Sequence, residues 1–253
     1  LVADRQQHAR LAIEAASVKV SEAQSGLDTR KKQLADFIAS QDPGEPVTPV
    51  VVLHDDFTKA TDDQWEIKNG DWKFEQGKLV QSEVTSFATI VAKQKLPIDV
   101  EIEVSYRTLA AGDYRSVGFS YDYIDGGNSQ DIYTSTGDET QTVQAFHRKD
   151  GKQEYPPAGI VKLPLKVGDL TVVRITARGQ SLTIWLNGEL KLQYQLPLAR
   201  TQGQFALWVH RGAAEFEELM VRQLVPSRED YERRALEGDR DLALALIDLQ
   251  IAE

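Results

Sequence analysis

Two kinds of hydrophobic periodicity divide the chain. In residues 1–39, apolar positions recur in alternating steps of three and four, which is the heptad pattern of a coiled-coil helix. The same spacing returns in residues 227–253, after a possible serine cap at Ser227, and predicts a second heptad helix. Each stripe is narrow, so each helix needs a partner to be stable in water. The stripe positions are Ile13, Ala16, Val20, Ala23, Leu27, Leu34 and Phe37, then Tyr231, Ala235, Gly238, Leu242, Ala245, Leu249 and Ala252.

Between the two predicted helices the period changes to two. Residues 40–49 contain three prolines and predict an extended linker. Residues 50–225 hold short segments in which apolar and polar positions alternate, as strands with one buried face do. Asn187-Gly188 predicts a type I′ hairpin turn, and residues 204–210 and 214–224 are expected to form a closing pair of strands. Many short strands with Gly and Asn turns favour an antiparallel β-sandwich.

Composition and charge exclude several chemistries. Asp and Glu number 39 against 29 Lys and Arg, a net charge of −10 that repels phosphate backbones, so no nucleic-acid partner is expected. Without cysteine there is no disulfide, thiolate nucleophile or zinc-thiolate site. No run of about 18 apolar residues occurs, so no membrane insertion of this segment is expected. Both ends look cut, and we expect a segment of a larger bacterial protein.

Motifs at both ends of the predicted sandwich resemble a known family. They are His54-Asp-Asp-Phe57, the segments 65–72 and 74–82, and the closing segments 203–212 and 216–221. In this order they resemble the concanavalin A-like lectin/glucanase sandwiches, in the laminin-G-like branch that includes the 3-keto-disaccharide hydrolase domains. The resemblance implies a mainly β fold, an antiparallel jelly-roll β-sandwich. Together with the heptad stripes, this predicts a sandwich flanked by N- and C-terminal coiled-coil-type helices. The resemblance also implies that the first and last strands lie side by side.

The resemblance breaks at positions that would carry catalysis. The hydrolase-like domains usually have an Asn-Ser-Gly-Ile-type strand that ends in Arg, where this chain has residues 116–122, Ser-Val-Gly-Phe-Ser-Tyr-Asp. The usual Phe-Arg-Asn of the last strand is Phe-Glu-Glu at residues 216–218. No catalytic residue is therefore carried over. With the family's curvature and the alternation of the strands, we expect a ligand-binding concave face that carries Ser116, Ser120, Asp122, His147, Trp208 and His210.

Three carboxylates share one face of a predicted strand: Asp99, Glu101 and Glu103. Successive members lie about 6–7 Å apart, similar to the Glu-x-Asp-x-Glu strand of family 16 glucanases. Retaining hydrolysis needs two carboxyl groups about 5–5.5 Å apart. The order here is Asp-Glu-Glu and no aromatic residue flanks it, so a solvated outer face is the favoured interpretation.

A loop rich in acidic and amide side chains could supply oxygen ligands to Ca²⁺. Asp122, Asp125, Asn128 and Asp131 surround two glycines there, but their spacing matches no calcium-loop motif, so an ordinary turn-rich loop is favoured. No other cofactor or metal is expected. Among the tryptophans, Trp208 is the best candidate to stack on a sugar, while Trp72 and Trp185 alternate like core residues.

Three functions remain open for this chain. The favoured one is a non-catalytic module that binds a glycan or presents neighbouring domains of the parent protein, and we expect it to be extracytoplasmic. The alternatives are a glycoside-cleaving enzyme of the 3-keto-disaccharide hydrolase type and a purely structural spacer on a helical stalk. The expected concave Arg and a pair of acids would favour the enzyme, and the Arg is missing from its strand.

Overall fold

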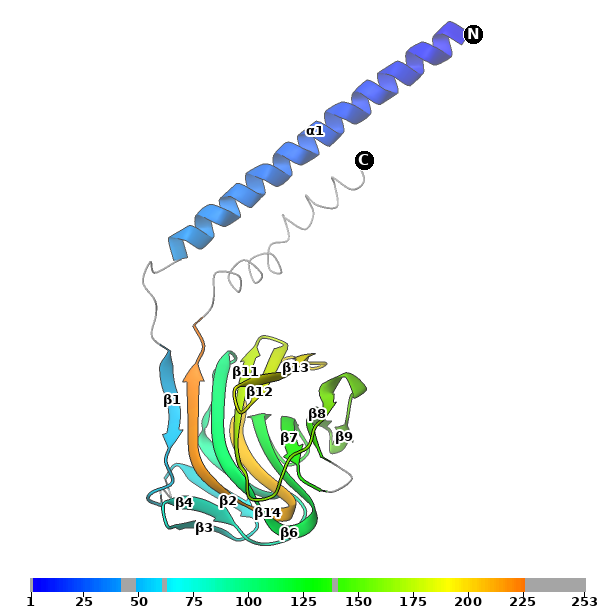
Figure 1. Cartoon of the computed structure of the whole chain (residues 1–253). Helices are drawn as coiled ribbons and strands as arrows, with labels where there is room; N and C mark the ends of the chain where they lie inside the picture. Colours follow the sequence, from blue (N-terminus) through cyan, green and yellow to red (C-terminus); the bar gives the residue numbers. More distant parts are fainter. Residues whose placement is uncertain (1, 42–48, 61–62, 138–140, 226–253) are drawn as a thin grey trace. The chain divides into compact units, whose positions relative to one another are not determined.

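A computed structural model describes residues 2–41, 49–60, 63–137 and 141–225 (Figure 1). The chain divides into two units. One contains the helix α1 (Val2–Gln41), and the other is the β unit, Pro49–Leu224. No described helix is long and apolar enough to cross a membrane. The predicted helix over 227–253 lies outside the described residues, so the coiled-coil pairing stays a prediction.

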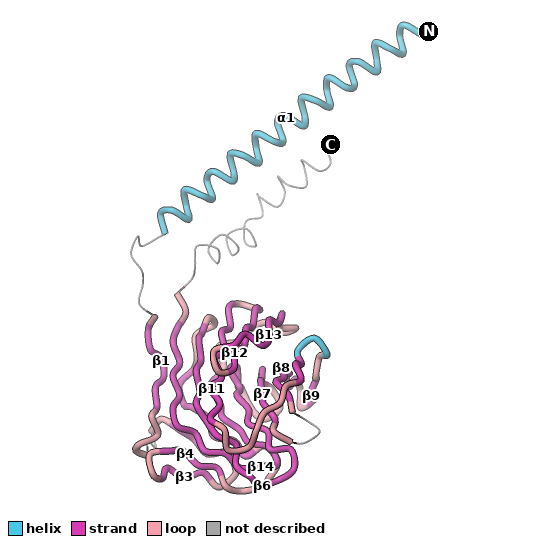
Figure 2. Tube along the Cα trace, in the orientation of Figure 1, coloured by secondary structure: helices cyan, strands magenta, loops and turns pink. Residues whose placement is uncertain are grey.

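The β unit contains fourteen antiparallel strands in one continuous sheet (Figure 2). They are β1 (Val50–Asp55), β2 (Trp65–Asn69), β3 (Trp72–Glu75), β4 (Lys78–Gln81), β5 (Ala88–Lys95), β6 (Val100–Tyr123), β7 (Ser129–Ser135), β8 (Thr142–Lys149), β9 (Lys152–Glu154), β10 (Ile160–Lys162), β11 (Leu170–Arg178), β12 (Ser181–Leu186), β13 (Glu189–Gln195) and β14 (Gln204–Gln223), with a 3₁₀ turn η1 (Pro157–Gly159) before β10.

The sheet forms a sandwich because β6 and β14 are long enough to pass through both layers. The C-terminal half of β6 and the N-terminal half of β14 lie in a first layer, whose strand order is β10-β8-β7-β6-β14-β5-β2. Their other halves lie in a second layer, where β13-β12-β11-β6-β14-β1 are neighbours and β4 also pairs with β14. This confirms the predicted mainly β sandwich.

Two opposed glycines lie where β6 and β14 bend from one layer into the other. Gly112 pairs with Gly212, and the register shifts on both sides of Gly212. Gly112 has φ +82°, and a Cβ there would lie 2.1 Å from the carbonyl oxygen of Arg211. A Cβ on Gly212 would lie 2.7 Å from the Cα of Arg115. Only glycine therefore allows the two backbones to approach so closely at the bend.

The core lies between the two layers and is built from the alternating apolar positions of both. Val100, Ile102 and Val104 of β6 are buried, as their alternation with acidic residues predicts. Trp72 is buried as predicted and stacks on Phe216 with ring centroids 5.9 Å apart. The prediction for Trp185 is wrong. It lies on the outward-facing side of β12, where the Arg174 guanidinium covers its ring at 4.2 Å.

Two expectations about chain connections are confirmed. β1 and β14 lie side by side in Figure 1, with Val50 paired to Gln223, so the chain enters and leaves the sandwich at neighbouring points. Asn187 and Gly188 both have positive φ, as a type I′ turn requires. The expected closing pair of strands is wrong: residues 204–223 form one continuous strand, β14, that pairs with β6 along its length. Alternation cannot show whether a glycine ends a strand or bends it.

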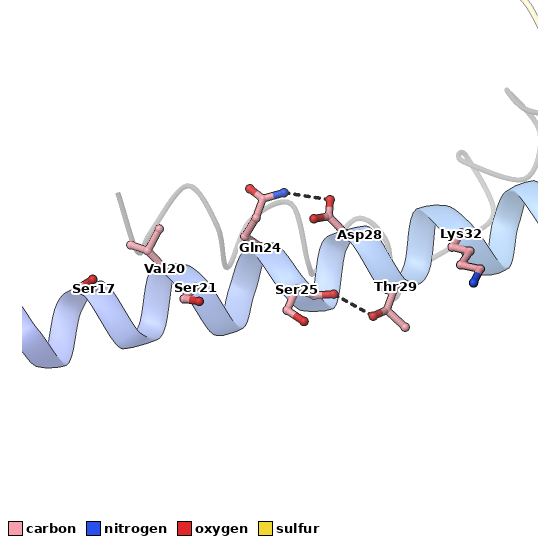
Figure 3. Close-up of a pocket in the computed structure, with 8 residues that line it drawn as sticks. All are labelled: Ser17, Val20, Ser21, Gln24, Ser25, Asp28, Thr29 and Lys32. Atoms are coloured by element: carbon pink, nitrogen blue, oxygen red, sulfur yellow. Dashed lines mark hydrogen bonds between the residues drawn. The ribbon is translucent and has the colours of Figure 1, made fainter.

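The helix α1 is rich in good helix formers and carries the predicted apolar stripe on one side. Leu27 is only 3% exposed, whereas Ile13 in the same stripe is 70% exposed. Figure 3 shows eight α1 residues that line a hollow along the helix, where Gln24 donates to Asp28 at 2.9 Å. These residues are mostly small and polar and form no cluster of catalytic type.

Candidate functional site

A cavity of about 240 Å³ opens on the first layer, on the face that points away from the core. Six of the nine side chains that line it are aromatic, and the other three can form hydrogen bonds. Its lining residues are Phe87, Tyr114, Ser116, Tyr133, Phe146, Gln153, Tyr155, Trp208 and His210. An aromatic lining with a few polar groups is typical of a small-molecule site.

Strand register brings the floor of the cavity together. Trp208 of β14 pairs with Gly118 of β6, which in turn pairs with Tyr133 of β7. A Cβ on Gly118 would lie 2.0 Å from the Trp208 ring, so the ring lies against bare backbone at this position. The neighbouring residues Val117 and Phe119 point into the core, because side chains alternate along a strand.

Two tyrosines at the rim expose a large part of their rings. Tyr155, after β9, is 44% exposed and stacks on Phe146 with centroids 4.7 Å apart and planes 13° apart. Tyr114, in β6, is 42% exposed and carries the Arg211 guanidinium at 5.0 Å from its ring centroid. One side of each ring is thus supported by the protein, which leaves the exposed part available to a ligand.

A buried polar cluster lies beside Trp208 on the same face of the sheet, and its centre is Asp131, which is fully buried. Its carboxylate accepts hydrogen bonds from Trp208 Nε1 at 3.0 Å and from the hydroxyls of Ser120 and Ser129 at 2.5 Å each. Arg148 Nε lies 3.6 Å from the same carboxylate. These donors join three strands and hold the Trp208 ring in one orientation.

The Arg148 guanidinium lies among the aromatic rings of the site. It is 4.4 Å from the ring centroid of Phe87 and 5.6 Å from those of Phe146 and Trp208. Its Nη2 atom is buried and has no hydrogen-bond partner among the described residues. The cation is therefore held by Asp131 and by the π-systems of these rings.

Burial sets the protonation of the titratable groups around the cavity. It raises the pKa of Asp131, against the opposing effects of Arg148 and the three hydrogen-bond donors. It also raises the pKa of Tyr133 to about 12, so this phenol stays protonated. The pKa of His210 is lowered, first by burial and then by the charges of Arg211 and Arg148, while Asp113 opposes the shift. His210 is therefore neutral near pH 7.

Three of the eight non-glycine residues with positive φ in the described part of the chain lie at or beside the cavity. Phe87, Arg115 and Arg211 have positive φ angles of 52°, 48° and 47°, a region that residues other than glycine rarely adopt. Phe87 lines the cavity, Arg115 lies between two lining residues, and Arg211 follows His210. Strained residues of this kind cluster at binding and catalytic sites.

The structure brings together three of the six expected site residues. Ser116, Trp208 and His210 line the cavity, and Ser116 pairs with His210 across two strands. Ser120 lies on the same face of the sheet but does not line the cavity, and its hydroxyl donates to Asp131. Trp208 is only 2% exposed, so it forms the floor and offers little surface on which a sugar could stack.

The other two expected residues lie elsewhere. His147 lies on the opposite face of β8 from Phe146, and its Nε2 is 3.2 Å from a carboxylate oxygen of Glu154. Asp122 accepts hydrogen bonds from the backbone N–H groups of Thr201 at 2.7 Å and Gly203 at 2.6 Å, so it anchors the segment before β14. Counting alternate positions along the predicted strands assigned both side chains to the concave face. This assignment is wrong, because an offset of one residue moves a side chain to the other face of the sheet.

Sequence reasoning missed most of the aromatic lining. Tyr133 could have been found, because it alternates with Asp131 and Ser135 along one strand. Phe87 and Tyr155 lie just outside strands, where no periodicity marks them. The missed lining residues are Phe87, Tyr114, Tyr133, Phe146, Gln153 and Tyr155.

The acidic groups singled out in the sequence have structural partners. Glu101 accepts a hydrogen bond from Arg222 at 3.1 Å on the outer face of the second layer, and Asp99 accepts one from the backbone of Gly179 at 2.8 Å. In the candidate calcium loop, Asp125 accepts from the backbone of Gly127 at 2.7 Å, while Asp131 belongs to the buried cluster. Among the described residues, no three His, Asp or Glu side chains are placed to hold a metal ion.

Solved structures share this fold at low sequence identity. The carbohydrate binding module CBM66 from Bacillus subtilis is 17% identical, with a TM-score of 0.57 over 63% of this chain and 96% of its own. The β-glucanase of Bacillus licheniformis is 14% identical, with a TM-score of 0.53 over 71% of this chain and 100% of its own. A Bacillus subtilis protein of unknown function with a galectin-like fold is 12% identical, with a TM-score of 0.54 over 69% of this chain and 96% of its own.

Sequence comparison identifies the family, although no curated protein matches the chain significantly. The profile of the 3-keto-α-glucoside-1,2-lyase-like domain matches residues 53–222, which span nearly the whole β unit and well over half of the chain. The matched region contains every residue that lines the cavity. The chain therefore belongs to the 3-keto-α-glucoside-1,2-lyase-like domain family.

Proposed function

We propose that the β unit is a non-catalytic carbohydrate-binding domain and that its site is the aromatic cavity of the first layer. The observation that carries this proposal is the lining: six aromatic rings together with the polar side chains of Ser116, Gln153 and His210. Sugars present C–H faces that pack on aromatic rings and hydroxyls that form hydrogen bonds, so this combination suits them. The family and the name of the Bacillus subtilis module point to the same ligand class.

The stacking role belongs to Tyr155 rather than to Trp208. Tyr155 is substantially exposed at the rim and is held parallel to Phe146 behind it. A ring that is already fixed loses little conformational entropy when a sugar packs on it. Trp208 contributes as an oriented floor, fixed by its hydrogen bond to Asp131.

The absence of acidic side chains from the lining supports a binding role without catalysis. Hydrolysis of a glycosidic bond by the usual route needs two carboxyl groups on either side of it. None of the nine lining residues is Asp or Glu. The carboxylate of Asp131, beside Trp208, is buried and is bound by Arg148 and three hydrogen-bond donors.

A second candidate function is cleavage of 3-keto-α-glucosides, the reaction class in the family's name. His210 is the observation that favours it. This histidine lines the cavity, and its pKa is lowered mainly by burial, so it is neutral near pH 7 and able to accept a proton. A spacer without any ligand is the third candidate, and the deep burial of Trp208 counts in its favour.

The test begins with a glycan array probed with the full chain. We expect binding to at least one glycan, and Tyr155→Ala should weaken it at least about tenfold, or about 1.4 kcal/mol. Leu190→Ala is the matched control, because Leu190 is 52% exposed on β13, away from the cavity. No array signal would overturn the binding proposal in favour of the spacer. Turnover of a 3-keto-α-glucoside that disappears in His210→Asn would favour the enzyme.

The wider setting is also part of this proposal. The domain belongs to a larger bacterial protein that is periplasmic or secreted, and it presents its site beside neighbouring domains of that chain. No cofactor is required, because binding through aromatic packing and hydrogen bonds needs no metal. Equal glycan affinity with and without a calcium chelator is the expected result.

A further inference from the structure

We infer that the cavity takes one sugar ring at a time, so that the domain recognises the end of a glycan chain and not its interior. This inference rests on the proposed function and adds the form of the ligand. It follows from the volume of the cavity, from the side chains that interrupt the surface around it, and from the number of polar groups inside it.

The volume matches a single ring. Pockets that enclose drug-sized ligands span roughly 300–1,000 Å³, and the cavity holds about 240 Å³. Two linked sugars are of drug size, so the cavity is too small to enclose both. Any further sugar of a bound chain has to extend into solvent and adds no contact within the cavity.

Aromatic side chains from three separate segments line the cavity. Phe87 precedes β5, Tyr114 lies in β6 beside the bend, and Tyr155 follows β9. An extended groove for consecutive sugars would need an open path between these segments. The three rings instead line one hollow of about 240 Å³.

Each of the three rings is held in place by the protein, so the walls are not easily displaced. Phe87 packs against the Arg148 guanidinium at 4.4 Å and against His210 with centroids 4.3 Å apart. Tyr114 is held by Arg211, which also forms an ion pair with Asp113. Tyr155 stacks on Phe146, and its hydroxyl donates to Gln153 at 2.7 Å.

The cavity has few polar groups available for hydrogen bonds, enough to recognise the hydroxyls of one sugar ring. The hydroxyls of Tyr133 and Tyr155 already donate to Gln144 and Gln153. Apart from the tyrosine hydroxyls, the polar groups come from Ser116, Gln153 and His210, on three different strands. The Nδ1 atom of His210 is buried and has no hydrogen-bond partner among the described residues. A buried polar atom without a partner is costly, and one hydroxyl of a bound ring could satisfy it if the tautomer and the pose allow.

Affinity as a function of chain length tests the inference. The probes are malto-oligosaccharides from maltose to maltohexaose, or the equivalent series of another glycan if the array favours it, measured by calorimetry with the full chain. We expect dissociation constants that agree within about twofold across the series. Tyr155→Ala should weaken all lengths by the same factor, and Leu190→Ala should weaken none. Affinity that rises with every added sugar would overturn the single-ring inference.

Binding to a polysaccharide provides a second, independent measurement. A chain-end binder is retained weakly on an intact polysaccharide and more strongly after limited endo-cleavage, because cleavage creates new ends at constant mass. Strong retention that does not change on cleavage would show binding to the chain interior and would contradict the inference. Neither result affects the proposed carbohydrate-binding function, which only the absence of all glycan binding would overturn.

Discussion

Trp208 lies against the backbone of Gly118, where a methyl group would be 2.0 Å from the indole ring. The same indole donates to Asp131, so its position is set by a missing side chain on one strand and a buried carboxylate on another. The aromatic residues that line the cavity are each held in place by separate contacts with neighbouring side chains. At the scale of single residues, the site is therefore an arrangement of rings that depends on a few supporting contacts.

Replacing Gly118 with alanine should disrupt this arrangement. The new Cβ forces the Trp208 ring to move, and such overpacking typically costs about 1–3 kcal/mol of unfolding free energy. Gly126→Ala is the matched control, because a Cβ there meets nothing within 4 Å. Urea denaturation followed by tryptophan fluorescence measures both. Equal stability of the two variants would contradict the packing described here.

The lowered pKa of His210 predicts loss of stability in acid. Because the folded state disfavours the charged imidazole, the stability linked to His210 is complete above the unfolded pKa of about 6.5 and is lost as the pH falls through the lower folded pKa. Wild type should thus lose more stability than His210→Asn between pH 7 and about pH 5. At pH 8 the imidazole is neutral in both states, which provides the reference. Parallel pH profiles of the two proteins would refute this.

At the scale of elements, two strands determine the shape of the β unit. β6 and β14 pair along their whole length: Val100 is opposite Gln223 at one end, and Tyr123 is opposite Gln204 at the other. Both strands bend where Gly112 is opposite Gly212. Strands beside one half form the first layer, and strands beside the other half form the second. The bend also carries Tyr114, so the geometry of this corner determines where one wall of the cavity lies.

Alanine at Gly112 should therefore destabilise the whole sandwich. It would combine a strained positive φ with a contact of 2.1 Å to the Arg211 carbonyl oxygen. Gly168→Ala separates the two effects, because Gly168 has a similar φ of +84° and nothing within 4 Å of its Cβ position. We expect about 1 kcal/mol for Gly168→Ala, from φ strain alone, and at least about 2 kcal/mol more for Gly112→Ala. Thermal unfolding of both variants measures these losses of stability. Equal losses in the two variants would contradict the prediction and show that the backbone relaxes to relieve the clash at Gly112.

At the scale of the whole molecule, the helical and β units pose separate folding problems. The sandwich has its own core, and its first and last strands are paired, so both connections to the rest of the chain leave from one place. The heptad stripes of residues 1–39 and 227–253 predict that the two segments form an antiparallel pair, a stalk that carries the sandwich. Leu27, at the centre of the first stripe, is almost fully covered.

This prediction is tested by charge placed in the stripe. Leu27→Asp should reduce the helical signal in circular dichroism, because a buried carboxylate without a partner opposes helix pairing. Ile13→Asp, in the same stripe but 70% exposed, should leave the signal nearly unchanged and serves as the control. Residues 49–224 alone should keep the β signal and lose the helical one. Equal helix content in the full chain and in Leu27→Asp would refute the stalk.

Local patterns in the sequence were sufficient for several elements, although not for the single long strand β14. The alternation along residues 100–104, the Asn187-Gly188 turn and the three- and four-residue spacing of α1 each depend on neighbours in the chain, and each predicted its element. The sandwich followed from the order of motifs at both ends of the β unit. These features are local or nearly local, so they can be read without knowing which segments meet.

Only the tertiary structure decided the site. Phe87 and Tyr155 are far apart in the sequence and lie outside strands, and their role appears only when the layer brings them to one cavity. His147 and Phe146 are neighbours in the chain, yet only Phe146 faces the cavity, because successive side chains point to opposite faces of a strand. Which face each strand turns to the core depends on register with other strands. That register is set by long-range pairing, which no local pattern contains.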